Sequence, residues 1–234
     1  MSGPKTFEYA LLGDALASAA AESLRQAGRE NAASRRSEND RREHESRMQA
    51  AASHRLAAAK AAAEEAATHD PLTGLWNHNR IIEILIEEMS RGDRQGQPVS
   101  LAMLDLDHFK HVNDTHGHVV GDEVLREIAR RLEHAVRVYD SVGRFGGEEF
   151  MIVLPGTDAA EAAQAAERIR SEISHDPVIT TAGTLQVTGS LGVVTHVGEL
   201  VDDATALLVA ADGALYDAKE SGRDRVTVAS MQSN

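Results

Sequence analysis

The spacing of apolar residues changes near residue 70. Before that point the chain is rich in Ala, Arg and Glu and poor in strand formers, which favours helix. We expect one helix over residues 7–26, a break at Gly28 and a second helix over residues 30–68. The first offers Leu11, Leu12, Ala15, Leu16, Ala19 and Ala20 at helical spacing, and the second offers Met48, Ala52, Leu56, Ala59 and Ala63. Large residues do not repeat in heptads here. The apolar stripe of the second helix consists mostly of small side chains, which indicates close but weak helix pairing.

Beyond residue 70, helical and strand patterns alternate. Helical spacing predicts helices over residues 77–90, 109–114, 122–138, 159–173 and 203–218. The first of these has its apolar face at Ile81, Ile82, Leu85, Ile86 and Met89. Strand patterns end at Asp105, flank the Gly146-Gly147 turn and recur over residues 185–197 and 225–229. The composition of residues 91–98 is typical of a loop. Periodicity alone therefore indicates an α+β class.

The stretch from Arg144 to Phe150 places two glycines and two adjacent carboxylates between β-prone runs. It predicts a hairpin whose turn carries Glu148 and Glu149. We expect the glycines to allow positive φ and, by lacking Cβ, to let a bulky ligand lie against the backbone. Neighbouring carboxylates repel each other unless a cation lies between them, so a divalent metal is expected here. An ordinary solvated hairpin tip would have the same composition.

A second acidic cluster lies where an apolar strand ends at Asp105. Side chains alternate along a strand, so Asp105 and Asp107 share one face, and the Leu106 carbonyl can serve as a further oxygen ligand. Hard oxygen ligands of this kind suit magnesium. Just beyond, the start of a short helix at Phe109 would direct backbone N–H groups toward a phosphate, and Lys110 would add a positive charge.

Charge separates the chain into two parts. Of the 37 acidic and 24 basic residues, ten of each lie in residues 1–69, so the formal net charge of −13 falls on residues 70–234. An acidic part of this kind disfavours nucleic-acid binding, which needs clustered Lys and Arg. We therefore expect an N-terminal helical region over residues 1–69 and a separate domain over residues 70–234.

The chain has no cysteine, which excludes a disulfide framework and thiol chemistry. No apolar run approaches the roughly 20 residues that a bilayer-spanning helix needs. Asp14 interrupts the early apolar run too soon for a secretory signal. We expect a cytoplasmic protein without membrane insertion.

Six ordered motifs of the second part resemble those of the GGDEF family, the diguanylate cyclases, in its GGEEF form. They are Asp70 to Leu75 with Asn77, Asp105 to Lys110 with Asn113-Asp114, Gly117-His118, Gly121-Asp122, Gly146 to Phe150, and Ala218-Lys219 with Gly222-Arg223. The resemblance runs from about Asp70 to the C-terminus. One departure is His78, which stands where the family usually has arginine and affects a local contact near the domain entrance.

The resemblance implies an α/β fold with a central, largely antiparallel sheet of the nucleotide-cyclase and polymerase-palm kind, flanked by helices. It implies condensation of two GTP into cyclic di-GMP with release of two pyrophosphates. A magnesium or manganese ion would be held by Asp105, the Leu106 carbonyl and Glu148. Glu149 would assist proton removal or hold a second metal. Each domain would hold one GTP, so two copies must face each other as a homodimer.

The resemblance also implies the contacts to GTP. Asn113 and Asp122 would read guanine, because an amide can donate and accept in one plane and a carboxylate can accept from both N1–H and N2–H. The triphosphate would be met by Phe109, Lys110, Gly147, Lys219 and Arg223. Simpler interpretations exist, because the helix dipole stabilises a carboxylate in the first turn and basic groups at the last turn. Asp122 could be such a carboxylate, and Lys219 and Arg223 could be such basic groups.

Arg137 and Asp140 form an Arg-x-x-Asp sequence, which by itself is a common ion pair at a helix end. Its place just upstream of the glycine turn matches the family's inhibitory site for the product cyclic di-GMP. Arg137 would contact phosphate or guanine and Asp140 would orient it, with Arg168 as a second contact.

Residues 1–69 then fit a dimerising signal stalk, or a helical linker to an upstream sensor or partner protein. A rival function is a catalytically silent receptor that binds cyclic di-GMP at the Arg137 site. The intact acidic turn argues against it, since a silent domain need not keep metal ligands. A further rival is a cyclase or polymerase that acts on another nucleotide.

Overall fold

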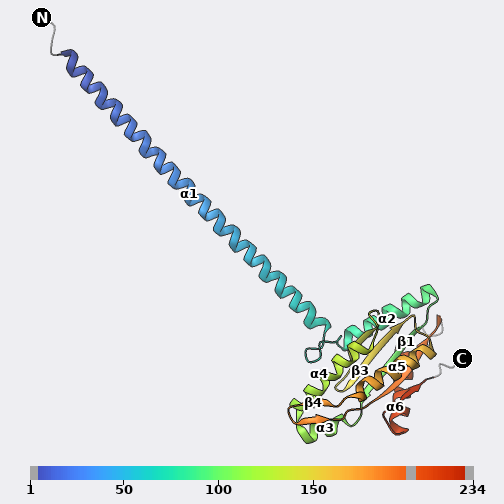
Figure 1. Cartoon of the computed structure of the whole chain (residues 1–234). Coiled ribbons are helices and arrows are strands. Elements are labelled where there is room, and N and C mark those ends of the chain that lie inside the picture. Colours follow the sequence, from blue (N-terminus) through green and yellow to red (C-terminus); the bar gives the residue numbers. More distant parts are fainter. Residues whose placement is uncertain (1–4, 199–203, 230–234) are drawn as a thin grey trace. The chain divides into compact units, whose positions relative to one another are not determined.

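The computed structural model describes residues 5–198 and 204–229. Residue contacts divide the chain into two units, residues 1–62 and residues 63–234. The described part of the first unit lies in one helix, α1 (Lys5–Thr68), which is coloured blue to cyan in Figure 1. In the two described stretches, every helix is too short or too polar to cross a membrane.

Helix α1 runs through Gly28 without a break, so the expected pair of helices is wrong. A single glycine lowers helix stability by about 1 kcal/mol relative to alanine, and the strong helix formers on both sides outweigh it. Exposed side chains prevail along the described part of this helix, and they include Leu24, Met48 and Leu56. The expected apolar positions Leu11, Leu12, Ala15 and Leu16 lie outside the described side chains.

The second unit is built on a five-stranded sheet in the order β2-β3-β1-β6-β7. Its strands are β1 (Val99–Leu106), β2 (Ser141–Arg144), β3 (Glu149–Pro155), β6 (Gly189–His196) and β7 (Val226–Val228). Neighbouring strands are antiparallel except for β6 and β7, which are parallel. The central strand β1 is buried along its whole length. This confirms the predicted largely antiparallel sheet.

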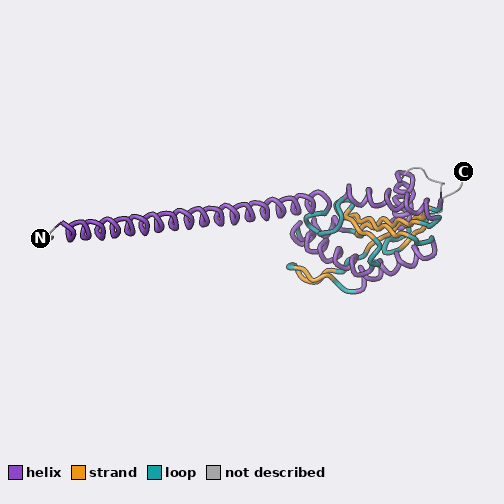
Figure 2. The backbone as a smooth tube through the Cα atoms, turned by 90° about the horizontal axis from the view of Figure 1, so that it is seen from above, coloured by secondary structure: helices purple, strands orange, loops and turns teal. Residues whose placement is uncertain are grey.

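Helices cover both faces of this sheet (Figure 2). They are α2 (His78–Gln95), α3 (Phe109–His116), α4 (His118–Ala135), α5 (Ala159–His175) and α6 (Ala204–Glu220). Ala102 and Leu104 of β1 belong to one apolar cluster, which contains residues of α3, α4 and α5. Leu101 and Met103 belong to the other, which contains residues of α2 and α6. The alternation along β1 thus separates two cores.

Helix α2 is longer than predicted, and its buried face agrees with the predicted one only in part. It buries Ile84 together with Ile81, Leu85 and Met89, whereas Ile86 is exposed. Residues 91–95, expected in a loop, are helical up to a C-cap at Gly96. Gly96 has the left-handed φ of 63° that such a cap favours, and its N–H donates to the last turn.

The expected strand over residues 185–197 is divided in two. Leu185 ends a small separate hairpin formed by β4 (Val178–Thr180) and β5 (Gly183–Leu185), and β6 begins only at Gly189. Between them, the Gln186 side chain donates to the Ser174 carbonyl of α5. Val187 is buried in the core, so the intervening residues cross from one sheet to the other.

Candidate functional site

The β2–β3 hairpin brings the predicted acidic turn beside the end of β1. Phe145 N–H and Gly146 N–H both donate to the Glu149 carbonyl, at 2.8 and 3.2 Å, which closes the turn. Leu106 N–H then donates to the Glu148 carbonyl at 3.3 Å. The two acidic clusters, far apart in sequence, therefore lie on adjacent strands.

The two glycines of the turn contribute the space that a side chain would fill, and not an unusual backbone conformation. Neither Gly146 nor Gly147 has the positive φ that we expected. A Cβ on Gly146 would lie 2.5 Å from Oε2 of Glu149, so the missing side chain makes room for that carboxylate. A Cβ on Gly147 would meet no atom within 4 Å. The backbone at Gly147 is thus open to a ligand.

Asp105 and Glu148 interact electrostatically. Burial raises the pKa of the Glu148 carboxyl, and the negative charge of Asp105 raises it further. Burial also raises the pKa of Asp105, while the hydrogen bond and charge of Lys219 oppose part of that rise. A bound cation would relieve the repulsion between the two carboxylates.

Two basic residues from the end of α6 accompany these carboxylates. Lys219 Nζ lies 2.8 Å from Oδ2 of Asp105. The charge of Arg223, which follows the helix, also acts on the Asp105 carboxyl. Lys219 and Arg223 therefore contribute positive charge at the acidic turn, whatever they add to the dipole of α6.

Helix α3 begins directly after the acidic end of β1. Its first residue, Phe109, is 3% exposed, so its side chain belongs to the core. His108 precedes it with a left-handed φ of 57°, which turns the chain from the strand into the helix. Lys110 is exposed on the first turn.

Asn113 on α3 lies against α4 at Gly121, the residue before Asp122. A Cβ on Gly121 would lie 2.0 Å from Oδ1 of Asn113, so only glycine leaves room for this approach. The helix begins at His118, four residues earlier than predicted, because Gly117 makes the turn alone. Asp122 therefore lies beyond the first turn, and the helix-dipole interpretation of this residue is wrong.

The Arg137 turn differs from the predicted ion pair. Helix α4 ends at Ala135, and the Asp140 carboxylate accepts from the backbone N–H of Arg137 at 2.8 Å. The guanidinium of Arg137 lies over the ring of Tyr139 instead. Burial raises the pKa of Asp140, and the charges of Arg137 and Arg168 oppose that rise.

A pocket opens beside this turn. It is lined by residues 136–138 and 140–142 of the turn and β2, by residues 74–76, and by His69 and Glu133. Oδ1 of Asp140 is one of the buried side-chain oxygens that have no hydrogen-bond partner in the described part of the chain. The Arg137 turn therefore lies beside a hollow and holds a buried carboxylate oxygen without a partner among the described residues.

Arg144, for which no role could be predicted from the sequence, joins the domain entrance to the acidic turn. Its Nη1 lies 3.2 Å from both carboxylate oxygens of Asp70, and its Nη2 donates to the Gly147 carbonyl at 2.7 Å. Burial alone would raise the pKa of Asp70, but hydrogen bonds from Thr73 and the charge of Arg144 lower it. Both residues stand in recognisable motifs, but nothing in the sequence pairs them.

His78, the departure from the family pattern, also contacts the turn. Its Nδ1 lies 2.7 Å from the Phe145 carbonyl oxygen, and its ring packs on the Phe145 ring with centroids 4.5 Å apart. The residue that departs from the family pattern thus contacts the hairpin through its imidazole ring.

Comparison with known proteins agrees with this geometry. The family described as "Diguanylate cyclase, GGDEF domain" matches residues 67–225. The response regulator PleD of Caulobacter vibrioides is 46% identical over 164 residues, which cover 69% of this chain and 36% of PleD. The chain thus corresponds to little more than a third of that relative.

Two solved structures are similar over most of the chain. Diguanylate cyclase SiaD of Pseudomonas aeruginosa, in complex with its activator SiaC, has a TM-score of 0.68 and 39% identity, covering 96% of this chain and 84% of SiaD. The coiled coil and GGDEF domain of DgcB from Caulobacter crescentus, in complex with c-di-GMP, has a TM-score of 0.71 and 31% identity. That match covers 77% of this chain and 95% of the DgcB chain. The family match, the relatives and the acidic hairpin agree, and the chain belongs to the GGDEF family of diguanylate cyclase domains.

Proposed function

We propose that this protein condenses two GTP into cyclic di-GMP and releases two pyrophosphates. The observation that carries the proposal is the meeting of Asp105 and Glu148 at the end of β1, with Lys219 on Asp105 at 2.8 Å. Carboxylates beside a cationic group and an open glycine backbone suit a nucleoside triphosphate with its metal. The family and the similar structures support the same activity.

The donor set fits a magnesium or manganese ion. Asp105, the Leu106 carbonyl and Glu148 supply hard oxygens. Burial raises the pKa of both carboxyls, and a neighbouring carboxylate adds to each rise: Asp107 for Asp105, and Asp105 for Glu148. The described residues hold no cluster of three or more His, Cys, Asp or Glu side chains suited to a metal, so substrate phosphates would complete the coordination. When bound, the ion supplies Lewis acidity at the 3′-hydroxyl and at the leaving pyrophosphate.

The protein's own groups would position GTP. Lys110 and the backbone N–H groups at Phe109 lie at the start of α3, where a helix favours phosphate. Lys219 and Arg223 would add positive charge beside Asp105, and Gly147 would let the nucleotide lie against the turn. Glu149 is a second carboxylate in that turn, available to accept the proton of the hydroxyl or to hold a second ion.

Guanine would be read by Asn113 and Asp122. Gly121 lets the Asn113 amide lie close to α4, immediately before Asp122. The Asp122 carboxylate would accept from N1–H and N2–H of guanine, a pair of donors that adenine lacks. This arrangement favours GTP over ATP as the substrate.

A screen of nucleotides tests the proposal. The purified protein is incubated with magnesium and either GTP or ATP, and products are identified by mass. We expect cyclic di-GMP and pyrophosphate from GTP and no cyclic product from ATP. Binding of cyclic di-GMP without turnover would support the silent receptor instead, and turnover of ATP would support a cyclase for another nucleotide.

The reaction requires two active sites to face each other, so we propose a homodimer assembled through residues 1–69. A helix of 64 residues with Leu24, Met48 and Leu56 exposed buries little of its own apolar surface. Isolated helices are marginal in water unless packing supports them. A second copy of α1 would supply that packing, with residues 70–234 acting as the GGDEF catalytic domain.

Deleting residues 1–69 is therefore expected to make specific activity depend on protein concentration. We expect at least about a tenfold loss at nanomolar protein, because the second GTP-bearing domain is no longer held nearby. Turnover per molecule is measured over a dilution series for the full chain and the truncated chain. Equal specific activities at every dilution would remove the dimerising role of α1.

The same region could receive a regulator. SiaD was solved in complex with its activator, and the match to SiaD covers 96% of this chain. We propose that residues 1–69 bind an upstream sensor or partner protein that sets the dimer geometry. Copurification of a partner with the full chain, but not with residues 70–234, is the expected result.

Product inhibition is proposed at the Arg137 turn. Arg137 would contact the phosphate or guanine of cyclic di-GMP, Asp140 would hold the turn through the Arg137 backbone N–H, and Arg168 would add a second charge. Because the Asp140 carboxylate binds the backbone N–H of Arg137 and not its side chain, Asp140 would orient the Arg137 guanidinium only indirectly.

Arg137→Ala is expected to raise the cyclic di-GMP concentration for half-inhibition at least about tenfold with little change in uninhibited turnover, since one charged contact is lost. Inhibition curves for GTP turnover measure this shift. Arg91→Ala, which removes an exposed arginine from α2, is the matched control. An unaltered inhibition curve would cancel the assignment of the Arg137 turn.

A further inference from the structure

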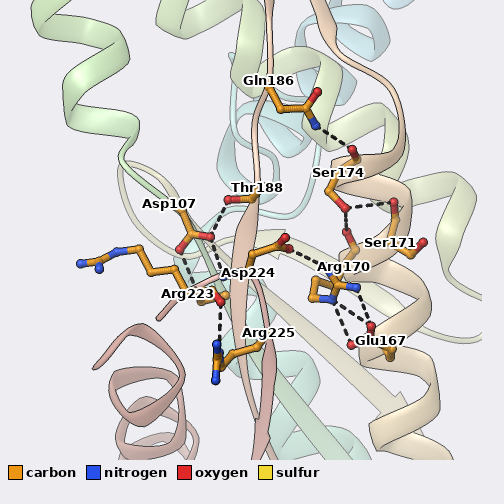
Figure 3. Close-up of polar contacts among 11 residues, drawn as sticks. Asp107, Glu167, Arg170, Ser171, Ser174, Gln186, Thr188, Arg223, Asp224 and Arg225 are labelled. Atoms are coloured by element: carbon orange, nitrogen blue, oxygen red, sulfur yellow. Dashed lines mark hydrogen bonds and ion pairs between the residues drawn. The ribbon is translucent and has the colours of Figure 1, made fainter. Parts of the chain in front are cut away.

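Asp107 is a buried carboxylate that the proposed reaction does not use. It accepts hydrogen bonds from Thr188 Oγ1 at 2.7 Å, from Ser190 Oγ at 2.7 Å and from the backbone N–H of Asp224 at 3.0 Å. Figure 3 shows it between the chain before β6 and the loop after α6. Its side chain therefore ties together three segments that are distant in sequence.

The loop that Asp107 holds has an unfavourable backbone. Arg223 and Asp224 are consecutive and both left-handed, with φ of 64° and 45°. Such a conformation costs about 1 kcal/mol or more for each residue with a side chain. It persists only where surrounding contacts enforce it, and such sites often serve function.

A second contact reaches the same loop from α5. Arg170 Nη1 lies 2.5 Å from Oδ1 of Asp224, and Nη2 lies 2.6 Å from Oε1 of Glu167. The Arg170 side chain is only 20% exposed, and Glu167 fixes it on the helix (Figure 3). Asp224 is thus held through its backbone by Asp107 and through its side chain by Arg170.

The residue next to Asp224 is Arg223, whose charge reaches Asp105. A guanidinium selects phosphate oxygens only when its direction is fixed, because two parallel hydrogen bonds need a defined geometry. The strained loop determines the direction in which the Arg223 side chain extends from the main chain. Contacts that enforce the loop therefore also set the aim of Arg223.

We propose that Asp107 and Arg170 are positioning residues, which hold the Arg223-Asp224 loop so that Arg223 meets the triphosphate. This inference rests on the proposed GTP reaction. Asp107 holds the loop through hydrogen bonds, since its three partners there are two hydroxyls and one N–H group. Its negative charge acts elsewhere, on the Asp105 carboxyl. An asparagine could accept from Thr188 and Asp224 and donate to the Ser190 hydroxyl.

Four variants of the full chain test the proposal: Asp107→Ala, Asp107→Asn, Arg170→Met and Arg130→Met. Arg130 makes an i, i+3 pair with Glu127 on α4, at 2.8 Å, that matches the Arg170–Glu167 pair but is not shared with Asp224. Amide hydrogen exchange of the segment 219–228 and the KM and kcat for GTP are measured for each. Exchange reports the loop without reference to activity.

Asp107→Ala and Arg170→Met are expected to speed exchange in this segment and to raise KM roughly tenfold, the effect of weakening one charged contact. Their kcat should stay within about threefold of the wild type, because the contact of Arg223 with the triphosphate is expected to be equally strong in the ground state and in the transition state. Arg130→Met should behave like the wild type in both measurements, and Asp107→Asn should keep wild-type exchange in segment 219–228. If Asp107→Ala does not fold, Arg170→Met and Asp107→Asn decide the question.

Unchanged exchange and KM in Arg170→Met, in a wild type that turns over GTP, would overturn the positioning role. So would an Asp107→Asn variant that folds but exchanges in segment 219–228 as fast as Asp107→Ala, because the hydrogen bonds of Asp107 would then not be what holds the loop. A wild type without GTP turnover would instead overturn the proposed function, and with it the phosphate role of Arg223.

Discussion

Replacing Glu148 by glutamine is expected to lower cyclic di-GMP formation by about a thousandfold, the scale at which a group that stabilises transition-state charge acts. Glutamine keeps the shape of the side chain but removes one of the two carboxylates that would hold the metal. The fold should not suffer, because burial and Asp105 already raise the pKa of Glu148, so its charge is unfavourable in the folded chain.

Chromatography of GTP reactions gives the rate, and thermal unfolding gives the stability. Glu172→Gln makes the same chemical change at an exposed position of α5 and should leave the rate unchanged. A Glu148→Gln protein that keeps a rate within tenfold of the wild type would refute the metal role of this carboxylate.

Gly192→Ala is expected to lower the free energy of unfolding by about 3 kcal/mol, at the upper end of overpacking effects. Gly192 lies in β6 where α6 crosses the sheet. A Cβ there would lie 2.2 Å from the Ala211 carbonyl oxygen and 2.2 Å from the Leu215 nitrogen. Both are backbone atoms, so α6 itself must move, and Lys219 at its end would move with it.

Gly213→Ala is the matched control within α6. A Cβ on Gly213 would meet nothing within 4 Å, so alanine should stabilise the helix by about 0.5–1 kcal/mol. Chemical denaturation of both variants measures the two changes, and GTP turnover reports the displacement of Lys219. Equal stabilities for the two variants would show that α6 does not approach β6 as closely as described.

Local features of the site could be predicted from the sequence. The hairpin around Gly146 and Gly147 is defined by neighbouring residues, and the apolar strand that ends at Asp105 identifies itself by its own composition. Their meeting was predicted through the family resemblance, because no pattern of spacing alone states which strands lie side by side. The largely antiparallel sheet was predicted on the same basis, and the structure confirms it.

Pairings between distant residues could not be predicted. Asp70 and Arg144 are 74 positions apart, and Asp107 meets Asp224 across 117 positions, so their contacts depend on the completed fold. Helix limits failed for a different reason. The balance at Gly28 involves about 1 kcal/mol, which neighbouring residues readily reverse. The predicted ion pair of Arg137 failed because a backbone N–H offered Asp140 a closer partner.

The central claim is that Asp105 and Glu148 jointly hold a divalent ion against the phosphates of GTP. Crystals grown with manganese and a non-reacting GTP analogue, measured at the manganese absorption edge, test it most directly. We predict an anomalous peak about 2.2 Å from oxygens of both carboxylates and in contact with the triphosphate. A nucleotide bound at the turn with the manganese peak elsewhere, or with none, would contradict the claim.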